Sequence, residues 1–507
     1  EAQIDGWLLI TNIPQNQLST TSDNIFVPRN YDQRVRFDQR TRTGGTVALQ
    51  YRPNPDLEVS VDYLTSSFLI ETQSTSMGHW FTSSNIENAV TDENGTVISF
   101  QQNNGHATDF HARTFDRPSK IGALGLNIDW QASASLAFDV DFSLSSARIK
   151  DTDGAANALS FIGYLNRSKF DHSANTILPS ISGYAADPNN GDGETTGTDY
   201  LDPANGRAHV MLRRGWNIHD DFDQFRINGK WDADWPVLQT VSFGLMLTHQ
   251  SKQNERWDNE FNSVHCTFCG YFAEPDLPDN LQQVFYAGDD FLKGISGYQG
   301  VPNTWLQHDG ETLFAFLESV SDISFDAVKR NNSFAVDETV AAAYLQFEFS
   351  TRLAQRELNI KTGLRYEKSR INVSGVEADL LALTILDQTE LGQLTSPPID
   401  VEQEGQYYDW LPSLTARWDL SDTLLTRFAV SRSLTRPTMS QMSPSLTLNT
   451  TRQGGDLRVS SGNPTLKPFE STNMDMALEW YFAPSSYLSV SYFRKKVDNF
   501  IVSEASD

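Results

Sequence analysis

The sequence predicts an all-β protein, and more specifically a section of an antiparallel transmembrane β-barrel with long extracellular connections. Three observations support this fold class. Apolar and polar residues alternate with a period of two, short turns and long connections follow each other in strict alternation, and aromatic residues gather at segment ends. Successive side chains of a strand point to opposite faces, so this alternation gives each strand one apolar and one polar face.

Period-two alternation recurs along the whole chain. In Leu136–Leu144, Leu, Phe and Val occupy the even positions, and Ala, Asp and Ser occupy the odd ones. The other clear segments are residues 57–63, 345–349, 474–480 and 488–492. Helical periodicity is scarce, and a short amphipathic helix is predicted only near Glu311–Val320, with Phe314 and Leu317 on its apolar side.

The connections between these segments separate into two kinds. Short turns rich in Pro, Asp and Ser are expected near residues 52–56, 130–134, 232–236, 352–356, 419–422 and 483–486. Long connections are expected near residues 74–108, 151–205, 255–335, 371–405 and 435–469. Compact soluble domains rarely hold such long loops, whereas outer-membrane barrels alternate tight periplasmic turns with long extracellular loops. Six hairpins give about twelve strands, and residues 4–10 could add a thirteenth.

Aromatic segment ends favour the membrane barrel over its main alternative. Tyr407–Trp410 and Trp480–Phe482 resemble the aromatic girdles that form where a barrel crosses the bilayer surface. The alternative is a large soluble all-β protein, such as a sandwich, in which the apolar faces would pack on a second sheet. No single strand distinguishes the two.

Composition excludes several other classes. The chain has 507 residues, with 39 Lys and Arg against 65 Asp and Glu, a formal charge of −26 that argues against nucleic-acid binding. Thirty Phe and 11 Trp are too many for a disordered acidic chain, and two Cys cannot form a disulfide scaffold. No apolar stretch is long enough to cross a bilayer as a helix.

Residues 407–502 resemble the C-terminal barrel region of TonB-dependent outer-membrane receptors, and the match is nearest to a large proteobacterial subfamily often associated with glycan scavenging. The stretches that carry the resemblance are residues 408–414, 425–437, 462–468, 473–482 and 488–496, with 44–53, 343–347 and 363–367 upstream. Within them, Arg436-Pro437 and Gly462-Asn463-Pro464 are expected to shape strand ends and turns rather than to contact substrate.

The resemblance implies a location and a function. Receptors of this family have 22 strands, an N-terminal plug and a short box that engages TonB. No plug or box is recognisable here, so residues 1–507 are interpreted as one partial barrel domain, with the plug domain and the last strands absent. The implied protein is a multi-pass barrel of the Gram-negative outer membrane that takes up a scarce substrate and is not an enzyme.

The resemblance also suggests the substrate and the partners. A carbohydrate (oligosaccharide) is the preferred substrate, a siderophore or other iron chelate is the alternative, and a soluble glycan-binding protein is a further one. Expected partners are outer-membrane lipid and lipopolysaccharide, the TonB complex through the missing plug region, and a surface-exposed lipoprotein or glycan-processing protein. Nucleic acid is not expected.

The longest connection offers a hypothesis for ligand binding. Aromatic faces can stack on the C–H faces of a sugar, while carboxylates and amides bind its hydroxyls. The candidate substrate-binding residues are Trp257, Tyr271, Phe272, Asp289, Asp290, Tyr298 and Trp305. The alternative is that these side chains pack the loop against itself, because an 80-residue loop needs a small core of its own.

Cys266 and Cys269 are predicted to form a local disulfide, because an outer-surface loop is in an oxidising environment. No second Cys/His pair completes a zinc site, and no catalytic constellation is evident. Asp151–Asp153 and Asp187–Asp192 faintly resemble calcium loops, so calcium is a candidate ligand of the acidic loops.

The negative charge is concentrated in the long connections. Four of the five are acidic, and residues 435–469 form the one net-positive loop. This distribution is expected to disfavour strongly anionic substrates and to make residues 435–469 the best place for an acidic group of a ligand.

Overall fold

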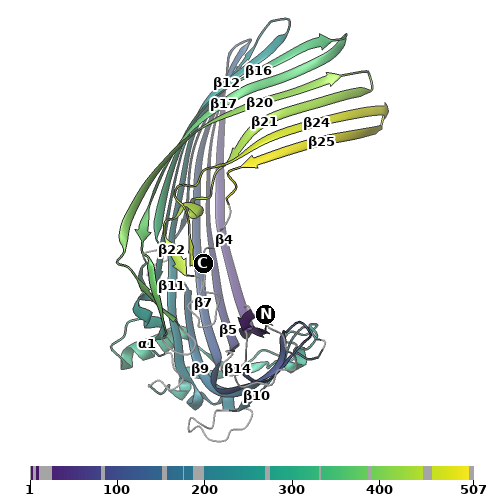
Figure 1. The fold of residues 1–507 in the computed structure, drawn as a ribbon. Coiled ribbons are helices and arrows are strands. Elements are labelled where there is room, and N and C mark those ends of the chain that lie inside the picture. Colours follow the sequence, from purple (N-terminus) through teal and green to yellow (C-terminus); the bar gives the residue numbers. More distant parts are fainter. Residues whose placement is uncertain are drawn as a thin grey trace.

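One long, strongly curved antiparallel sheet dominates the computed structural model (Figure 1). The structure describes residues 2–3, 7–10, 25–81, 86–150, 157–174, 176–185, 199–268, 275–330, 333–385, 391–448 and 459–501. The short turns lie at one end of the sheet, and the helix α1 and the strands β10 and β14 lie at the other end, which we call the loop end.

Twelve long strands follow one another as neighbours in chain order. They are β4 (Asn30–Asn54), β5 (Leu57–Trp80), β7 (Val97–Ser133), β8 (Leu136–Ile149), β11 (Arg207–Asp232), β12 (Leu238–Asp258), β16 (Phe334–Leu353), β17 (Arg356–Glu377), β20 (Ile399–Asp419), β21 (Leu424–Thr435), β24 (Phe469–Ala483) and β25 (Ser486–Asp498). The all-β antiparallel fold class is therefore confirmed, and the six short turns lie where the sequence predicts them.

Shorter strands and helices lie before and between the long strands in the chain. The strands are β1 (Ala2–Gln3), β2 (Trp7–Ile10), β3 (Ile25–Pro28), β6 (Ile86–Thr91), β9 (Asn157–Asp171), β10 (Ser180–Ala185), β13 (Gln282–Tyr286), β14 (Thr304–His308), β15 (Val328–Lys329), β18 (Leu380–Ile385), β19 (Leu391–Thr395), β22 (Leu446–Leu448) and β23 (Val459–Ser461). The helices are α1 (Gly310–Val320) and the 3₁₀ turns η3 (Asp199–Leu201), η4 (Pro203–Asn205), η5 (Phe261–Cys266), η6 (Asp279–Leu281), η7 (Tyr298–Gly300) and η8 (Met439–Met442).

The long strands expose one apolar and one polar face near the turns. On the apolar face, Leu49 of β4 is 69% exposed and Leu245 of β12 is 59% exposed. The polar face carries networks such as Asn127, which donates to Asp139 and Asp141 at 2.9 and 3.0 Å. In a transmembrane barrel the apolar face meets lipid and the polar face lines the interior.

The first and last long strands form the edges of the sheet. β4 pairs with β5 and with the two residues of β1, and β25 pairs with β24. Side chains of both edge strands are highly exposed, as Tyr51 (68%) and Phe493 (77%) show.

The strands are much longer than a membrane requires. β4 has 25 residues and β7 has 37, whereas about 9–11 tilted residues cross the hydrocarbon core. We therefore assign the roughly ten residues nearest each short turn to the membrane, and the remainder of each strand to the extracellular side. The sequence places the loop starts too early here: β5 continues to Trp80, and β7 begins at Val97 rather than near residue 108.

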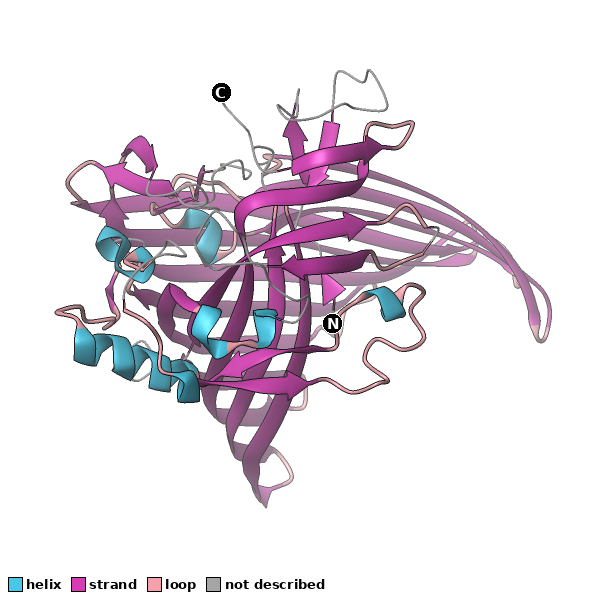
Figure 2. Ribbon diagram, turned by 90° about the horizontal axis from the view of Figure 1, so that it is seen from below, coloured by secondary structure: helices cyan, strands magenta, loops and turns pink. Residues whose placement is uncertain are grey.

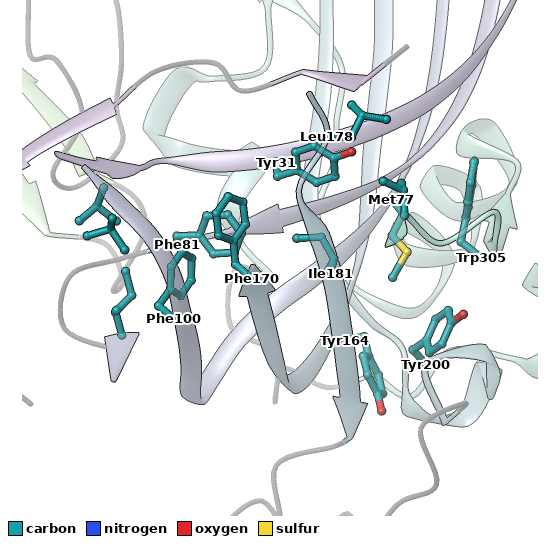
Figure 3. Packing of buried hydrophobic residues seen from close by; sticks show 14 of the residues in the cluster. Tyr31, Met77, Phe81, Phe100, Tyr164, Phe170, Leu178, Ile181, Tyr200 and Trp305 are labelled. Atoms are coloured by element: carbon teal, nitrogen blue, oxygen red, sulfur yellow. The ribbon is translucent and has the colours of Figure 1, made fainter. Parts of the chain in front are cut away.

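The reason for this difference is that both faces of the strands are covered at the loop end. A core cluster packs on the continuation of the apolar face, around Tyr31, Met77 and Trp305, each at most 1% exposed (Figure 3). In the same cluster, the rings of Phe81 and Phe100 lie 4.9 Å apart. Apolar residues on one face no longer alternate with exposed polar ones, so the sequence pattern is lost.

The predicted helix is confirmed as α1. The Asp309 carboxylate accepts the Thr312 backbone N–H at 2.8 Å and caps the helix. Phe314 and Leu317 are fully buried against β9 and β11, and the helix lies beside the sheet when the molecule is seen from the loop end (Figure 2). Among the described residues, none of the helices has the length and apolar character needed to cross a bilayer.

We expect Phe243→Arg to destabilise the inserted protein by about 2–4 kcal/mol, because it places a charge on the lipid face near the middle of the membrane part of β12. The measurement is the denaturant midpoint of the folded band on a heat-modifiability gel. Ser242→Arg, on the polar face of the same strand, is the control and should change stability by less than about 0.5 kcal/mol. Equal effects would contradict the assignment of the two faces.

Candidate functional site

The polar face holds a cavity of about 510 Å³ at mid-height, which we call the interior pocket. Three neighbouring strands, β11, β12 and β16, supply its wall, and the segment after β21 supplies its other side. Its lining residues are Asp220, Phe222, Gln224, Met246, Thr248, Gln250, Lys252, Glu338, Val340, Arg436, Pro437, Thr438, Met439 and Ser440. The strand residues are alternate ones, as expected for a single face of a sheet.

The charges in the interior pocket compensate one another. Lys252 lies 3.3 Å from the Asp220 carboxylate, to which Gln250 also donates at 3.0 Å. Arg436 forms an ion pair with Glu338 at 3.1 Å. The pocket therefore offers paired charges, amides and hydroxyls, together with the apolar Phe222, Met246, Val340 and Met439.

Arg436 connects the segment after β21 to β16 and β17 through ion pairs with Glu338 and Glu367. Its guanidinium lies 2.5 Å from Glu367 and donates to Ser369 at 3.3 Å. Tyr407 donates to Glu338 at 3.1 Å and so supports the same ion-pair network. Arg436 belongs to the one net-positive loop, but its charge is neutralised by two carboxylates.

A small apolar cluster and a close backbone approach hold the same segment. Met439 and Met442 pack on Val336, Ile371 and Val373 of the polar face. Gly462 lies so close to the turn that an added Cβ would be 2.5 Å from the carbonyl oxygens of Gln441 and Ser443. The Asn463 backbone N–H donates to the Gln441 carbonyl at 2.8 Å, so the Gly-Asn-Pro motif braces one side of the interior pocket.

A second cavity of about 270 Å³ lies further toward the loop end, and we call it the aromatic cavity. Its lining residues are Phe115, Asp116, Arg117, Pro118, Ile149, Trp216, Ile218 and Asn254. Ile218 and Asn254 face each other across β11 and β12, one polar-face step beyond Asp220 and Lys252. The two cavities therefore follow one another along the same pair of strands.

A buried polar cluster joins the four strands β4, β5, β7 and β11 above the aromatic cavity. Asp109 is completely buried, its carboxylate lies 2.9 Å from His209 Nδ1, and it accepts a hydrogen bond from the Trp80 indole. Burial would raise the pKa of Asp109, but the charge and hydrogen bond of His209 hold it below its usual value. Ser76 lies 3.0 Å from His111 Nδ1, and Gly78 leaves the space that the His111 ring and Asp32 occupy.

The structure brings together some of the residues that the sequence selects for ligand binding. Trp305 is fully buried, donates to Thr75 at 3.0 Å and contacts the rings of Phe285 and Phe291. Tyr298 packs against the same cluster. In this conformation Trp305 therefore serves the core of the loop, which is the alternative that the sequence leaves open.

The other candidates lie apart from this core. Asp289 accepts a hydrogen bond from Tyr286, and Asp290 pairs with Lys293 at 2.5 Å, in an exposed turn of the same loop. Trp257 lies on β12 beside Lys329 of β15. Tyr271 and Phe272 lie outside the described residues. Whether any of these residues binds substrate stays a prediction.

Cys266 is disulfide-bonded, and the chain has one other cysteine, Cys269, which lies outside the described residues. The acidic segments 151–153 and 187–192 also lie outside them. Within the part of the chain that the structure describes, no group of three or more His, Cys, Asp or Glu side chains could hold a metal ion.

Sequence reasoning missed both cavities. Their residues lie on alternate positions of strands, which the sequence marks only as a polar face. What the sequence does not show is that Asp220, Lys252 and Glu338, from three strands, meet in one place. Arg436 and Pro437 line the interior pocket, although the sequence predicts that they shape a strand end rather than contact substrate.

A family comparison decides what the chain is. The model for "TonB dependent receptor-like, beta-barrel" matches residues 157–507. The chain belongs to this family. TonB-dependent receptors are multi-pass β-barrels of the Gram-negative outer membrane, they work with TonB, and they are receptors and transporters rather than enzymes. The predicted location is confirmed, and the glycan subfamily is not shown.

Solved structures include similar barrels at low identity. The ferric-catecholate import receptor Fiu from K12 E. coli is 9% identical, with a TM-score of 0.39 over 92% of this chain and 58% of that one. The ferric yersiniabactin uptake receptor FyuA from Yersinia pestis is 9% identical, with a TM-score of 0.34, and the match covers 52% of its length. The ferric citrate transporter FecA is 8% identical, with a TM-score of 0.33, and the match covers 61% of its length. This barrel chain thus spans just over half the length of these proteins. No curated protein matches the sequence significantly.

We expect the loop end of this receptor barrel to lose stability as the pH falls below about 6.5. Burial lowers the pKa of His79 and His111 to about 3 and that of His308 to about 4. The unfolded state therefore binds more protons between those values and 6.5, at a cost of up to about 1.4 kcal/mol per histidine and pH unit.

Hydrogen exchange of the backbone amides of residues 108–112, measured from pH 7 to pH 5 and corrected for intrinsic rates, checks this expectation. The amides of residues 123–129, in the membrane half of β7, are the internal control. His111→Gln should flatten the pH dependence. Protection that is independent of pH would contradict it.

Proposed function

We propose that this chain forms the wall of a TonB-dependent outer-membrane receptor that takes up a scarce oligosaccharide. The long loops would capture the ligand, and the interior pocket would hold it on its way through the barrel. Energy would come from the TonB complex acting on a plug.

The observation that carries this proposal is the chemistry of the interior pocket. Its two acids and two bases are paired, which suits a ligand body without net charge. Its amides and hydroxyls, from Gln224, Gln250, Thr248, Thr438 and Ser440, can exchange hydrogen bonds with sugar hydroxyls. Phe222 offers an aromatic face for the C–H side of a sugar ring.

The acidic loops are consistent with the same ligand. Their charge suits a surface that faces divalent cations bound by lipopolysaccharide, and calcium is a candidate ligand there. A surface-exposed lipoprotein or a glycan-processing protein would be a natural partner for delivery of oligosaccharides. A siderophore or other ferric chelate remains the alternative substrate, and the binding experiment below separates it from a carbohydrate.

We expect Gln224→Leu and Gln250→Leu each to weaken oligosaccharide binding about tenfold, because each removes hydrogen bonds worth about 1–1.5 kcal/mol at nearly constant volume. The measurement is retention of a pool of oligosaccharides of two to eight sugars by outer membranes containing the full receptor, with the retained sugars identified by mass spectrometry.

Gln253→Leu is the matched control, since Gln253 is exposed and lies on the opposite face of the same strand. Trp257→Ala in the same assay tests the loop aromatics, and unchanged retention would remove their proposed role. Retention of ⁵⁵Fe-labelled ferric citrate or ferric catecholate, with no retention of any sugar, would overturn the carbohydrate proposal.

A further inference from the structure

The polar face of β7 carries a stripe of alternating cations and an aromatic ring at the rim of the aromatic cavity. Arg113, Phe115 and Arg117 occupy successive positions of one face, with the Arg113 guanidinium 5.7 Å from the centre of the Phe115 ring. Phe115 and Arg117 line the cavity opposite Trp216. We call these three residues of β7 the arginine stripe.

The arginine stripe carries two positive charges and lies beside one carboxylate, Asp116, which also lines the cavity. Arg113 donates to the Asn157 side-chain oxygen at 3.0 Å, a neutral partner. In the described part of the chain, neither Arg113 nor Arg117 forms an ion pair with a carboxylate, although Asp116 lies next to Arg117 at the cavity. Burial and the charges of Arg34, Arg36 and Arg214 lower the pKa of Arg113, so four guanidiniums share one region.

Two other carboxylates of the polar face, Asp38 and Glu260, are already paired with other guanidiniums. Asp38 lies 2.8 Å from Arg36 and 3.9 Å from Arg40, and it accepts the Thr72 hydroxyl. Glu260 lies close to both Arg214 and Arg256. Neither carboxylate is therefore paired with Arg117, which lines the cavity, or with Arg113, which lies over the Phe115 ring beside it.

The strand arrangement explains why a cavity forms here. Between β7 and β11, the neighbouring strand changes from β8 to β9. The pairing of β8 with both strands ends at Ile149, opposite Ser119 and Ile218. The pairing of β9 with both strands begins at Asn157, opposite Phe115 and Arg214. Arg117 of β7 and Trp216 of β11 lie at the positions between the end of the β8 pairing and the start of the β9 pairing. Their side chains therefore meet at a change of neighbours in the sheet.

From this arrangement we infer that the aromatic cavity is an anion subsite, which binds a ring bearing a negatively charged group, such as the terminal uronate of an otherwise neutral oligosaccharide. Phe115 and Trp216 contact the ring faces, the Arg117 guanidinium binds the carboxylate through charge-assisted hydrogen bonds, and Arg113 adds positive charge from beside Phe115. The inference rests on the proposed function, and it extends that function by adding an acidic end to a neutral ligand body.

The two cavities together select a ligand that neither would select alone. The interior pocket is balanced in charge and begins one polar-face step below the aromatic cavity, so a chain of a few sugars could occupy both. The acidic loops oppose ligands with many negative charges, which leaves a single acidic end as the best fit. The sequence favours residues 435–469 for an acidic group of a ligand, and within this loop Arg436 is already paired with Glu338 and Glu367.

The test compares xylotriose bearing a single terminal 4-O-methylglucuronate, the neutral xylotriose and ⁵⁵Fe-labelled ferric citrate as probes of outer membranes containing the full receptor. We expect the natural protein to retain the singly acidic sugar at least about tenfold better than xylotriose, and Arg113→Gln/Arg117→Gln to lose that preference, as loss of charged hydrogen bonds requires. Raising the salt concentration should reduce the preference.

Two controls separate charge from folding. Arg42→Gln removes an exposed guanidinium from the polar face of β4, away from the cavity, and should leave the preference unchanged. Arg117→Gln alone changes an exposed side chain and should give an intermediate loss in a protein with normal heat-modifiability.

Each outcome has a separate meaning. Equal retention of acidic and neutral sugars by the natural protein, or unchanged preference in the double variant, would overturn the anion subsite while leaving the proposed function in place. Failure to retain either sugar would overturn the anion subsite as a sugar site and the proposed function together. Arginine-dependent retention of ferric citrate in that case would assign the anion to an iron chelate.

Discussion

The structure depends on one constraint. The two strands of each very long hairpin stay paired residue by residue over many successive positions. β4 and β5 remain in register from Asn30–Trp80 to Tyr51–Val59, and β16 pairs with β17 along the whole length of β16. Because side chains alternate strictly along a strand, unbroken register fixes which face every residue occupies. A slip of one residue would exchange the lipid face and the interior face of a whole strand.

The same two faces take different partners at different heights. Near the short turns the apolar face meets lipid. Toward the loop end, α1 and the core around Trp305 pack on the same face. The polar face carries the interior pocket, the aromatic cavity and then the buried Asp109–His209 pair in succession. The two cavities and the buried pair thus lie at successive heights along strands that are longer than the bilayer is thick.

Much of the wall could be predicted from the sequence, because alternation and turn residues are local signals. The hairpin turns, the helix α1 and the connection from Thr435 to Phe469 lie where the sequence predicts them. The extracellular continuation of the strands could not be predicted, since polar side chains such as Gln33 and His79 are buried on the continuation of the apolar face. The cavities could not be predicted either, because residues such as Asp220 and Glu338 are brought together by register rather than by sequence spacing.

Cysteine labelling in intact cells tests the central claim, that the polar face lines a water-filled interior, most directly. Cys266 is disulfide-bonded, so single cysteines at Gln224 and at Phe225 can be compared against a low background. A hydrophilic maleimide should modify Gln224→Cys and spare Phe225→Cys, and a lipid-soluble maleimide should show the opposite preference. Equal labelling of the two positions, or the reverse pattern, would contradict the account.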